Sequence, residues 1–371
     1  MSYSHRERVL AAFRHEQPDR VPMDLMGNAS MLLDEPYLLL RDHLGLSPIP
    51  PVRAGQPASY YDERILEHFD IDFRRVFLPV HPEVDVVHHA DGSFTDPWKI
   101  RYVREGPFVN SVENPLAGIS TLAELEEYRW PRPEEMFATE GLRDTAKRLC
   151  EETDYAIVAR NPLTQGFLDR ACYLMGMGDF FVTIRLYPDL AQAIFDGILE
   201  VYQGVYAMFL EAVGPYVQMV ETADDLGTSG SLMVSPKMYR QHIKPAEVAL
   251  SRAIRERAPD AFIFRHCDGS VAPLLDDFIE TGTDILNPVQ TSLPGMDAAE
   301  LKQQFGDRLI FHGGVEGYEG PRDAVVEEVR RLIDAFAPGG GYVFASCNHI
   351  IEAPPENVVA MFETARDYST R

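Results

Sequence analysis

The feature that most constrains the fold is a repeating unit. A short β-branched or aromatic run is followed by a polar turn and then by a longer helical pattern, and the unit recurs along the whole chain. Strands that alternate with helices form right-handed βαβ units and a parallel sheet. Eight such units favour a closed (β/α)8 barrel, and no GxGxxG follows the first strand to indicate a dinucleotide-binding sheet. The predicted strands are 20–25, 72–80, 155–160, 217–221, 261–266, 284–288, 308–313 and 342–346.

Two segments depart from this repeat. The opening residues, "MSYSHRERVLAAFRHEQPDR", predict an amphipathic helix ahead of the first strand. Residues 81–120 contain alternating runs separated by DG and DP turns, which predicts a β-hairpin excursion over one end of the barrel. We therefore expect residues 1–371 to form a single α/β TIM-barrel domain with an N-terminal helical extension.

Charge and cysteine content narrow the class of protein. A formal net charge of −24 argues against binding to nucleic acid or to an anionic membrane surface. No apolar run long enough for a membrane span stands out, and the charged N-terminus is not a signal peptide. The four cysteines are widely spaced and form no disulfide framework. We expect a cytoplasmic enzyme.

Ionisable and amide side chains follow the predicted strands. In a barrel of this type the reactive groups lie at the carboxyl ends of the strands, which converge on one axis. Histidine, cysteine, aspartate and glutamate together are the ligands that zinc accepts. The polar residues at these ends are Asp24, Asn28, Asn161, Gln165, Glu221, Asp224, Asp225, His266, Asp268, Asn287, Gln290, His312, Glu316, Cys347, Asn348 and His349.

The stretch "FIFRHCDGS", residues 262–270, places three such groups directly after one strand. The two-residue period of a strand puts His266 and Asp268 on one face and Cys267 on the other. If His266 faces the rim, Asp268 joins it and Cys267 packs outward as a small apolar side chain. Cys347 is then the nearest thiol from another strand.

Several segments, spread in order over the chain, resemble the uroporphyrinogen decarboxylase superfamily. They are "SHRERVLAAFRHEQPDRVPMD", "SPKMYRQHIKP", "HCDGSVAPLLDDFIETGTDILNPVQ" and "FHGGVE…PGGGYVFASCNHIIEAPPENVVAMFE". The resemblance implies a TIM barrel, usually a homodimer, with its pocket at the carboxyl ends of the strands. This agrees with the fold predicted from the repeating unit.

The superfamily holds two activities, and the sequence departs from one of them. True uroporphyrinogen decarboxylases carry an Arg-rich "RQAGR" loop after the first strand, whereas this chain has "PMDLMGNASML". The other branch comprises methyltransferases that exchange a methyl group with the cobalt of a separate corrinoid protein. Their zinc members use a His-x-Cys pair and a late Cys. His266 and Cys347 match two of these positions, and Asp268 stands where the middle Cys is usual.

The resemblance implies a zinc site formed by His266, Asp268 and Cys347, with Glu221 as a fourth ligand. The zinc would act as a Lewis acid on a methyl donor or acceptor. The chain would then be the substrate-side component of an O-demethylase, and another protein would carry the corrinoid.

Further residues receive roles in this scheme. Asp224 and Asp225, with His266 and Asp268, are the predicted catalytic groups. Three rim aromatics, Phe167, Tyr239 and Tyr318, would sandwich a methoxyaromatic substrate. The predicted substrate-binding residues are Asn161, Asn287, His312 and Asn348.

Two alternatives stay open. One is a metal-free decarboxylase or lyase acting on a carboxylic acid smaller than a porphyrin, which the missing Arg-rich loop opposes. The other is a barrel that only binds a ligand or partner, against which the many ionisable residues at one rim argue. Metal content and thiol reactivity distinguish the methyltransferase from both.

Overall fold

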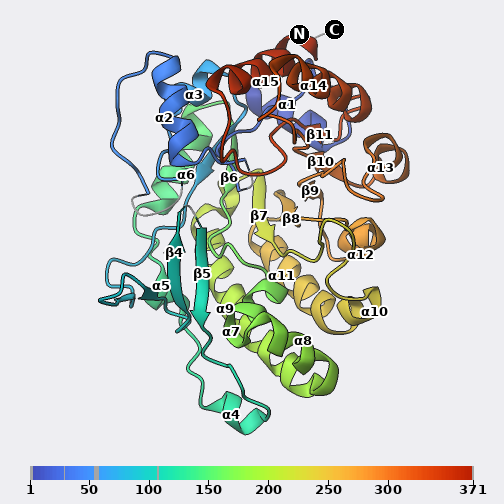
Figure 1. The fold of residues 1–371 in the computed structure, drawn as a ribbon. Helices are drawn as coiled ribbons and strands as arrows, with labels where there is room; N and C mark the ends of the chain where they lie inside the picture. Colours follow the sequence, from blue (N-terminus) through green and yellow to red (C-terminus); the bar gives the residue numbers. More distant parts are fainter. Residues whose placement is uncertain (1–2, 29, 54–57, 107, 370–371) are drawn as a thin grey trace.

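A parallel sheet of seven strands forms the centre of the molecule (Figure 1). The computed structural model describes residues 3–28, 30–53, 58–106 and 108–369. The strands follow one another in chain order, β1-β6-β7-β8-β9-β10-β11, and all neighbours are parallel. Each overlaps one of the predicted strands. They are β1 (Phe73–Val76), β6 (Ala156–Ala159), β7 (Met219–Ala223), β8 (Phe262–His266), β9 (Ile285–Asn287), β10 (Ile310–His312) and β11 (Tyr342–Val343).

The predicted first strand, 20–25, closes the sheet but is not a full strand. Met23 forms a single parallel bridge with Phe344, and the carbonyl of Met23 accepts the backbone N–H of Asp72 at 3.0 Å, directly before β1. The segment therefore joins β11 to β1, so that the sheet curls into a barrel. The prediction of its length is wrong because Pro22 has no N–H to donate and Met26, at φ 60°, turns the chain away.

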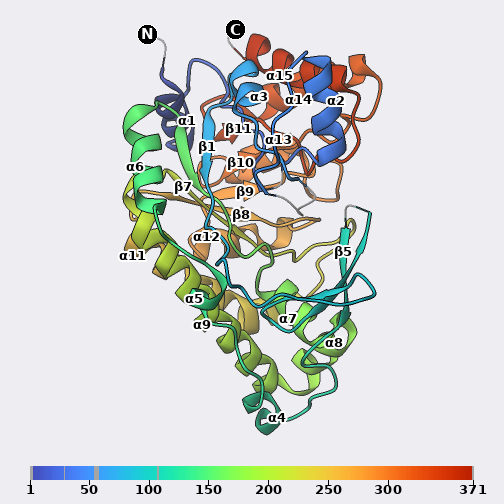
Figure 2. The ribbon, with the colours of Figure 1, turned by 90° about the vertical axis from the view of Figure 1, so that its left-hand side faces the viewer.

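Helices surround this barrel, as Figures 1 and 2 show. The predicted N-terminal helix is confirmed as α1, which begins with a capping box between Ser4 and Glu7. The helices are α1 (His5–Phe13), α2 (Asp34–His43), α3 (Glu63–His68), α4 (Leu122–Glu126), α5 (Pro133–Met136), α6 (Leu142–Glu152), α7 (Phe167–Met175), α8 (Met177–Leu186), α9 (Pro188–Val213), α10 (Pro236–Met238), α11 (Lys244–Arg257), α12 (Leu275–Glu280), α13 (Ala298–Phe305), α14 (Arg322–Phe336) and α15 (Pro355–Tyr368). Two short 3-10 helices, Gly214–Tyr216 and Ala272–Leu274, and one π-helical segment, Tyr239–Ile243, complete them.

The excursion predicted near residues 81–120 is a sheet of its own (Figure 2). Its antiparallel strands, paired in chain order, are β2 (Val87–His88), β3 (Phe94–Thr95), β4 (Arg101–Glu105) and β5 (Phe108–Glu113). It is thus a four-stranded meander, larger than the predicted hairpin. The buried ring of Trp98 anchors it, since that ring packs edge-on against Tyr202 of α9.

The barrel interior has two layers that the two-residue strand period explains. An apolar layer lies at the amino ends of the strands and includes Phe264, and Val9 and Phe13 of α1 pack into it. In six of the seven strands the inward side chain two residues further along is polar or charged instead, whereas in β11 Val343 is followed by Ala345. These steps are Phe73 to Arg75, Val158 to Arg160, Met219 to Glu221, Phe264 to His266, Ile285 to Asn287 and Ile310 to His312. The barrel interior therefore has an apolar layer at the amino ends of the strands and a polar layer at their carboxyl ends.

Candidate active site at the carboxyl ends of the strands

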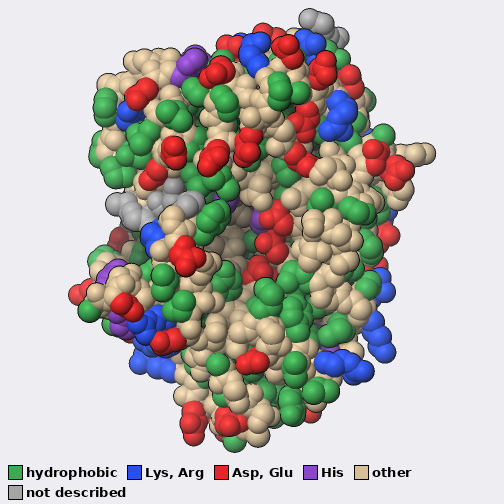
Figure 3. Space-filling model, in the orientation of Figure 1, with side chains coloured by type: hydrophobic (Ala, Val, Ile, Leu, Met, Phe, Trp, Pro, Cys, Tyr) green, Lys and Arg blue, Asp and Glu red, His purple; other side chains and the backbone are tan. Residues whose placement is uncertain are grey.

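One histidine and two aspartates form a cluster at this end of the barrel, and we call Asp225, His266 and Asp268 the triad. One ligand atom from each lies within 4.8 Å of the others. The Nε2 atom of His266 is 3.7 Å from Oδ1 of Asp225 and 3.6 Å from Oδ2 of Asp268. Figure 3 shows the molecule hollowed near the centre of this face, with acidic and histidine side chains at the margin. The triad joins the loop after β7 to the loop after β8.

The orientation of His266 is fixed by Asn287. The Nδ1 atom of His266 lies 2.8 Å from the amide oxygen of Asn287, and the amide nitrogen of Asn287 lies 2.9 Å from Nδ1 and 3.4 Å from the carbonyl oxygen of His312. Because the carbonyl oxygen of His312 can only accept a hydrogen bond, the Asn287 atom that faces it is the NH₂ nitrogen, and the amide oxygen faces His266. His266 therefore donates from Nδ1 and, in its neutral form, points the Nε2 lone pair at the two carboxylates, as in metal-binding histidines held by an outer partner.

The two carboxylates are held as firmly. Asn348 donates to both oxygens of Asp268, at 3.0 and 3.2 Å, and the backbone N–H of Asp268 donates to Asp225 at 2.8 Å. Gly269, at φ 100°, has no room for a Cβ against Gly227, so the turn after β8 requires glycine there. The 266–269 turn is thereby fixed against the loop after β7.

The pKa values of His266 and Asp268 are set by the charges of their neighbours in the triad. Burial alone would lower the pKa of His266, but the Asp268 and Asp225 carboxylates outweigh it and raise that pKa to about 9. Burial likewise opposes ionisation of Asp268, yet the hydrogen bond and charge of His266 hold its pKa below the ordinary value. Without a bound cation, His266 is therefore protonated at neutral pH and acts as the counterion of the carboxylates.

A hydrogen-bonded chain runs from the triad across the barrel interior. Beyond Asn287, Nε2 of His312 lies 2.9 Å from Asp24, and Asp24 forms a two-point ion pair with Arg75. Burial opposes the charge of Asp24, but Arg75 and His312 lower its pKa to about 2. Arg75 also lies 3.3 Å from Glu221. Asn287 and His312, predicted to bind substrate, are thus buried members of a connected polar network.

Asp224 occupies a different position from Asp225. Its carboxylate accepts the backbone N–H groups of Leu168, at 3.0 Å, and Asp169, at 3.3 Å, and so caps α7. A Cβ on Gly166 would lie 2.2 Å from the Asp224 side chain, which is why glycine precedes this helix. Burial and then Asp169 raise the pKa of Asp224. Asp169, which the sequence prediction missed, has its pKa raised to about 7 by burial and Asp225.

Two predicted zinc ligands lie outside the triad. Glu221 is fully buried and faces Arg75 and, at 3.7 Å, Arg160, and it also accepts the N–H of Asn161 at 3.2 Å. Cys347 is buried, and burial raises the pKa of its thiol. Among residues 3–28, 30–53, 58–106 and 108–369, the candidate metal-binding group is the triad, and neither Glu221 nor Cys347 belongs to it.

A cavity of ≈ 740 Å³ opens beside the polar layer, and we call it the arginine cavity. The sequence prediction missed its arginines, although charged residues inside the predicted strands 72–80 and 155–160 were a signal for them. Phe167 and Tyr239, predicted to hold an aromatic substrate, are instead buried in the core. The lining consists of Val52, Arg53, Tyr61, Arg75, Phe77, Leu78, Pro79, Val80, Phe137, Arg160, Asn161, Pro162 and Thr164.

His349 links the arginine cavity to the triad. Burial, followed by repulsion from His266 and from Arg160, lowers the pKa of His349 to about 4. Its buried Nδ1 atom has no hydrogen-bond partner among the described residues. The neutral His349 ring therefore stands within electrostatic reach of both regions.

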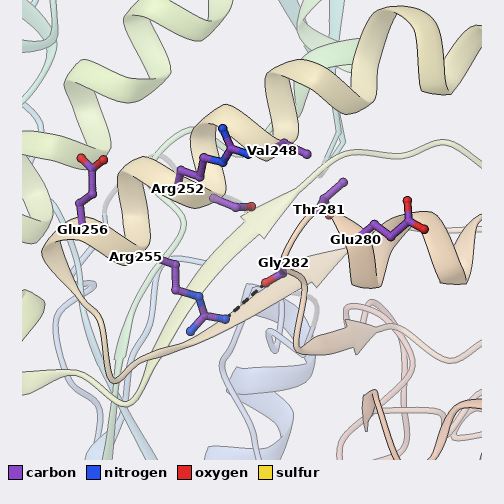
Figure 4. Close-up of a pocket in the computed structure, with 8 residues that line it drawn as sticks. Val248, Arg252, Arg255, Glu256, Glu280, Thr281 and Gly282 are labelled. Carbon is purple, nitrogen blue, oxygen red and sulfur yellow. Dashed lines mark hydrogen bonds between the residues drawn. The ribbon is translucent and has the colours of Figure 1, made fainter.

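A second hollow, of ≈ 500 Å³, lies on the outside of the barrel between α11 and α12 (Figure 4). Its lining includes Arg255 and Glu280, and Arg255 donates to the carbonyl oxygen of Gly282 and pairs with Asp284. None of the predicted site residues lines it. The candidate site at the strand ends therefore consists of the triad and the arginine cavity.

A parallel barrel with a buried ionisable network and a cavity at its carboxyl ends is the architecture of a barrel enzyme. The family model described as Uroporphyrinogen decarboxylase (URO-D) matches residues 99–368. The chain therefore belongs to the uroporphyrinogen decarboxylase (URO-D) family, as the motifs predicted. The prediction that residues 1–371 form one domain stays a prediction.

Two known proteins show how far the likeness extends. A uroporphyrinogen decarboxylase of Azoarcus sp. (strain BH72) is 33% identical over 79 residues, which is 20% of this chain and 22% of that protein. A methyltransferase from Methanosarcina mazei has the same fold, with a TM-score of 0.69 and 18% identity over 99% of both chains. The curated relative is thus matched over about a fifth of its length, and the solved structure supports the fold alone.

One helix meets the length and composition of a membrane span. It covers Pro188–Tyr216, and half of its most apolar window is buried inside the molecule. The core helix of a soluble protein meets the same test, so this is weak evidence for a membrane.

Proposed function

We propose that the protein is a zinc-dependent methyltransferase that moves a methyl group between a small methoxyaromatic substrate and a separate corrinoid protein. The observation that carries the proposal is the triad. One imidazole nitrogen and two carboxylates, each held by an outer hydrogen bond, are a donor set of the size that catalytic zinc sites use, with a position left for substrate. Family membership and the methyltransferase-like fold also support it.

In this proposal the triad residues bind the ion, and the network behind them orients it. His266 would ligate through Nε2 with Asp225 and Asp268, while Asn287 and Asn348 hold the ligands in place. Zinc, when bound, supplies a Lewis acid that stabilises negative charge developing on the substrate oxygen. This set is richer in oxygen than a thiolate site, so manganese competes better here than it would at a cysteine site.

The proposed transfer balances without a further oxidant. The methyl–oxygen bond of the ether breaks with both electrons going to oxygen. The methyl carbon bonds to the cobalt(I) of the acceptor through an electron pair of the metal. The phenolate then takes a proton from solvent.

We also propose that the protein is a cytoplasmic homodimer.

Free cob(I)alamin serves as the acceptor in the test. The zinc-loaded protein is mixed with 4-methoxybenzoate under reducing conditions, and the cob(I)alamin spectrum is followed as it converts to that of methylcobalamin. Asp225→Asn and His266→Ala should abolish the conversion, while Arg255→Gln, far from the strand ends, should not change it. Conversion that proceeds equally in the His266→Ala variant contradicts the proposal.

A metal-free decarboxylase is the second candidate function. The specific observation in its favour is that an imidazole flanked by two carboxylates lies near a cavity lined by arginines. The imidazolium of His266 could protonate the carbon left after loss of carbon dioxide. Release of carbon dioxide from a small aromatic acid by chelator-treated protein would favour this function over methyl transfer.

A further inference from the structure

The arginine cavity holds more positive charge than its carboxylates neutralise. Three guanidinium groups, from Arg53, Arg75 and Arg160, line it, and the buried carboxylates they contact are those of Asp24 and Glu221. Arg75 contacts both carboxylates, and Arg160 also lies 3.7 Å from Glu221. Three guanidinium groups therefore share two carboxylates, which leaves one positive charge in excess.

Arg160 has few partners for a buried cation. It is 4% exposed, and its Nε atom has no hydrogen-bond partner among the described residues. That Nε atom lies 3.7 Å from Oε2 of Glu221, which is an ion-pair distance but too long for a hydrogen bond. The other contacts of the guanidinium are the carbonyl oxygen of Asn161, at 2.9 Å, and the sulfur of Met31, at 3.7 Å. Burial lowers the pKa of Arg160 to about 10, since the guanidinium has lost water without gaining full compensation.

Arg53 also lines the cavity and approaches the same sulfur atom as Arg160. It approaches the sulfur of Met31 at 3.6 Å and lies over the ring of Phe77. The Glu221 charge acts on it only at longer range, because no carboxylate of the described residues lies within ion-pair distance of Arg53. A thioether is a weak acceptor for either arginine. Two guanidinium groups thus converge on one sulfur atom, where an anion would satisfy both.

The other residues that line the cavity favour an anion whose uncharged part is aromatic. Three rings, those of Tyr61, Phe77 and Phe137, border the cavity with Leu78 and Val80. Tyr61 accepts the backbone N–H of Arg75 at 3.1 Å, which leaves its own O–H free to donate. The volume of ≈ 740 Å³ suits a small organic ligand.

We propose that the arginine cavity binds an aromatic acid whose carboxylate lies between Arg53 and Arg160. A planar carboxylate matches the fork of a guanidinium better than a single point charge does. These arginines stand at positions other than the Arg-rich loop that the chain lacks after Leu25. The inference names the substrate class of the proposed methyl transfer and rests on that function, but the binding itself needs neither metal nor corrinoid.

The test measures binding of 4-methoxybenzoate and of neutral 4-methoxybenzamide to chelator-treated protein by calorimetry. The wild type should bind the acid at least about tenfold more tightly than the amide. Arg160→Gln and Arg53→Gln should each remove that preference, and Arg160→Lys should keep part of it. Arg255→Gln, which removes an arginine from the outer hollow, should leave the preference intact. Urea unfolding of each variant checks that it is folded.

Three results would overturn the inference. They are equal binding of acid and amide by the wild type, an unchanged preference in both glutamine variants, and tighter binding of inorganic phosphate than of the acid. A carboxylate preference without methyl transfer would leave the inference standing and reject the function. Methyl transfer that is equally fast from 4-methoxybenzamide and from the acid would support the proposed function and reject the inference about the arginine cavity.

Discussion

The triad and the arginine cavity share one end of the barrel but have opposite charge balances. In the triad two carboxylates face a single imidazole, whereas in the arginine cavity three guanidinium groups face two carboxylates. Between them, Asn287, His312 and Asp24 form a buried chain whose donors and acceptors are paired. The comparison shows that this end of the barrel keeps a mainly acidic cluster and a mainly basic cavity apart, which are the proposed cation and anion sites.

Within the arginine cavity, the same comparison separates structural from ligand-binding residues. Arg75 donates hydrogen bonds to Asp24 and Glu221, while the Nε atom of Arg160 lies 3.7 Å from Glu221 and has no hydrogen-bond partner among the described residues. Removing a buried cation that is the main partner of buried carboxylates leaves those charges unpaired and destabilises the fold, whereas a buried cation with incomplete partners is a candidate for binding a ligand.

The largest expected effect tests this separation. Arg75→Met should lower the free energy of unfolding by about 3–5 kcal/mol, because it leaves two buried carboxylates without their cation. Arg160→Met should change it by less than about 1 kcal/mol, since Glu221 keeps Arg75 and the N–H of Asn161. Urea unfolding measures both. Equal losses would show that the two arginines have the same role.

Acid titration tests the chain between the two regions. The pKa of Asp24 is about 2 in the folded protein, against an ordinary value of 3.8. A lowered pKa stabilises the fold above pH 3.8, and the contribution is lost as the pH falls toward 2. The wild type should therefore lose about 2 kcal/mol more than Asp24→Asn between pH 4 and pH 2 in urea unfolding. Parallel losses in the two proteins would contradict the pairing of Asp24.

Asn287 tests whether the network orients the triad. Asn287→Ala removes the acceptor of His266 Nδ1–H, and zinc affinity should fall by about 10- to 100-fold. Asn114→Ala is the matched control, because it removes a side-chain amide that donates a hydrogen bond to the carbonyl oxygen of Tyr173, outside the barrel interior. Competition with a fluorescent chelator measures both affinities. An unchanged affinity in Asn287→Ala would mean that His266 needs no outer partner.

The smallest effect concerns Cys347. Because the thiol lies outside the triad, Cys347→Ser should change zinc affinity by less than about threefold. The same chelator competition applies. A loss comparable to that of Asn287→Ala would establish a thiolate ligand and extend the metal site beyond the triad.

The strands were predictable because their signal is local. Seven of the eight predicted runs became β1 and β6 to β11. The predicted first strand, 20–25, forms only a single bridge, because Pro22 lacks an N–H and the chain turns at Met26. The pairing of His266 with Asp268 follows from the strand period, and the structure places these side chains 3.6 Å apart.

The partners of the other side chains were not predictable. Glu221 faces arginines and Asp224 caps α7, and neither contact can be inferred from a list of strand ends. The arginine cavity joins the end of β6 to a loop more than a hundred positions earlier in the chain, so only the folded barrel shows it. Spacing identifies which residues reach the rim, and packing decides what each one contacts.

The central claim is that the triad binds a divalent metal ion. Its most direct test is the metal content of protein purified without an affinity tag and offered zinc, measured by mass spectrometry beside His266→Ala and Asp268→Asn. The account predicts about one zinc ion per chain in the wild type and its loss in both variants, with folding confirmed by circular dichroism. A folded wild type that binds no metal, or variants that retain it fully, would contradict the account.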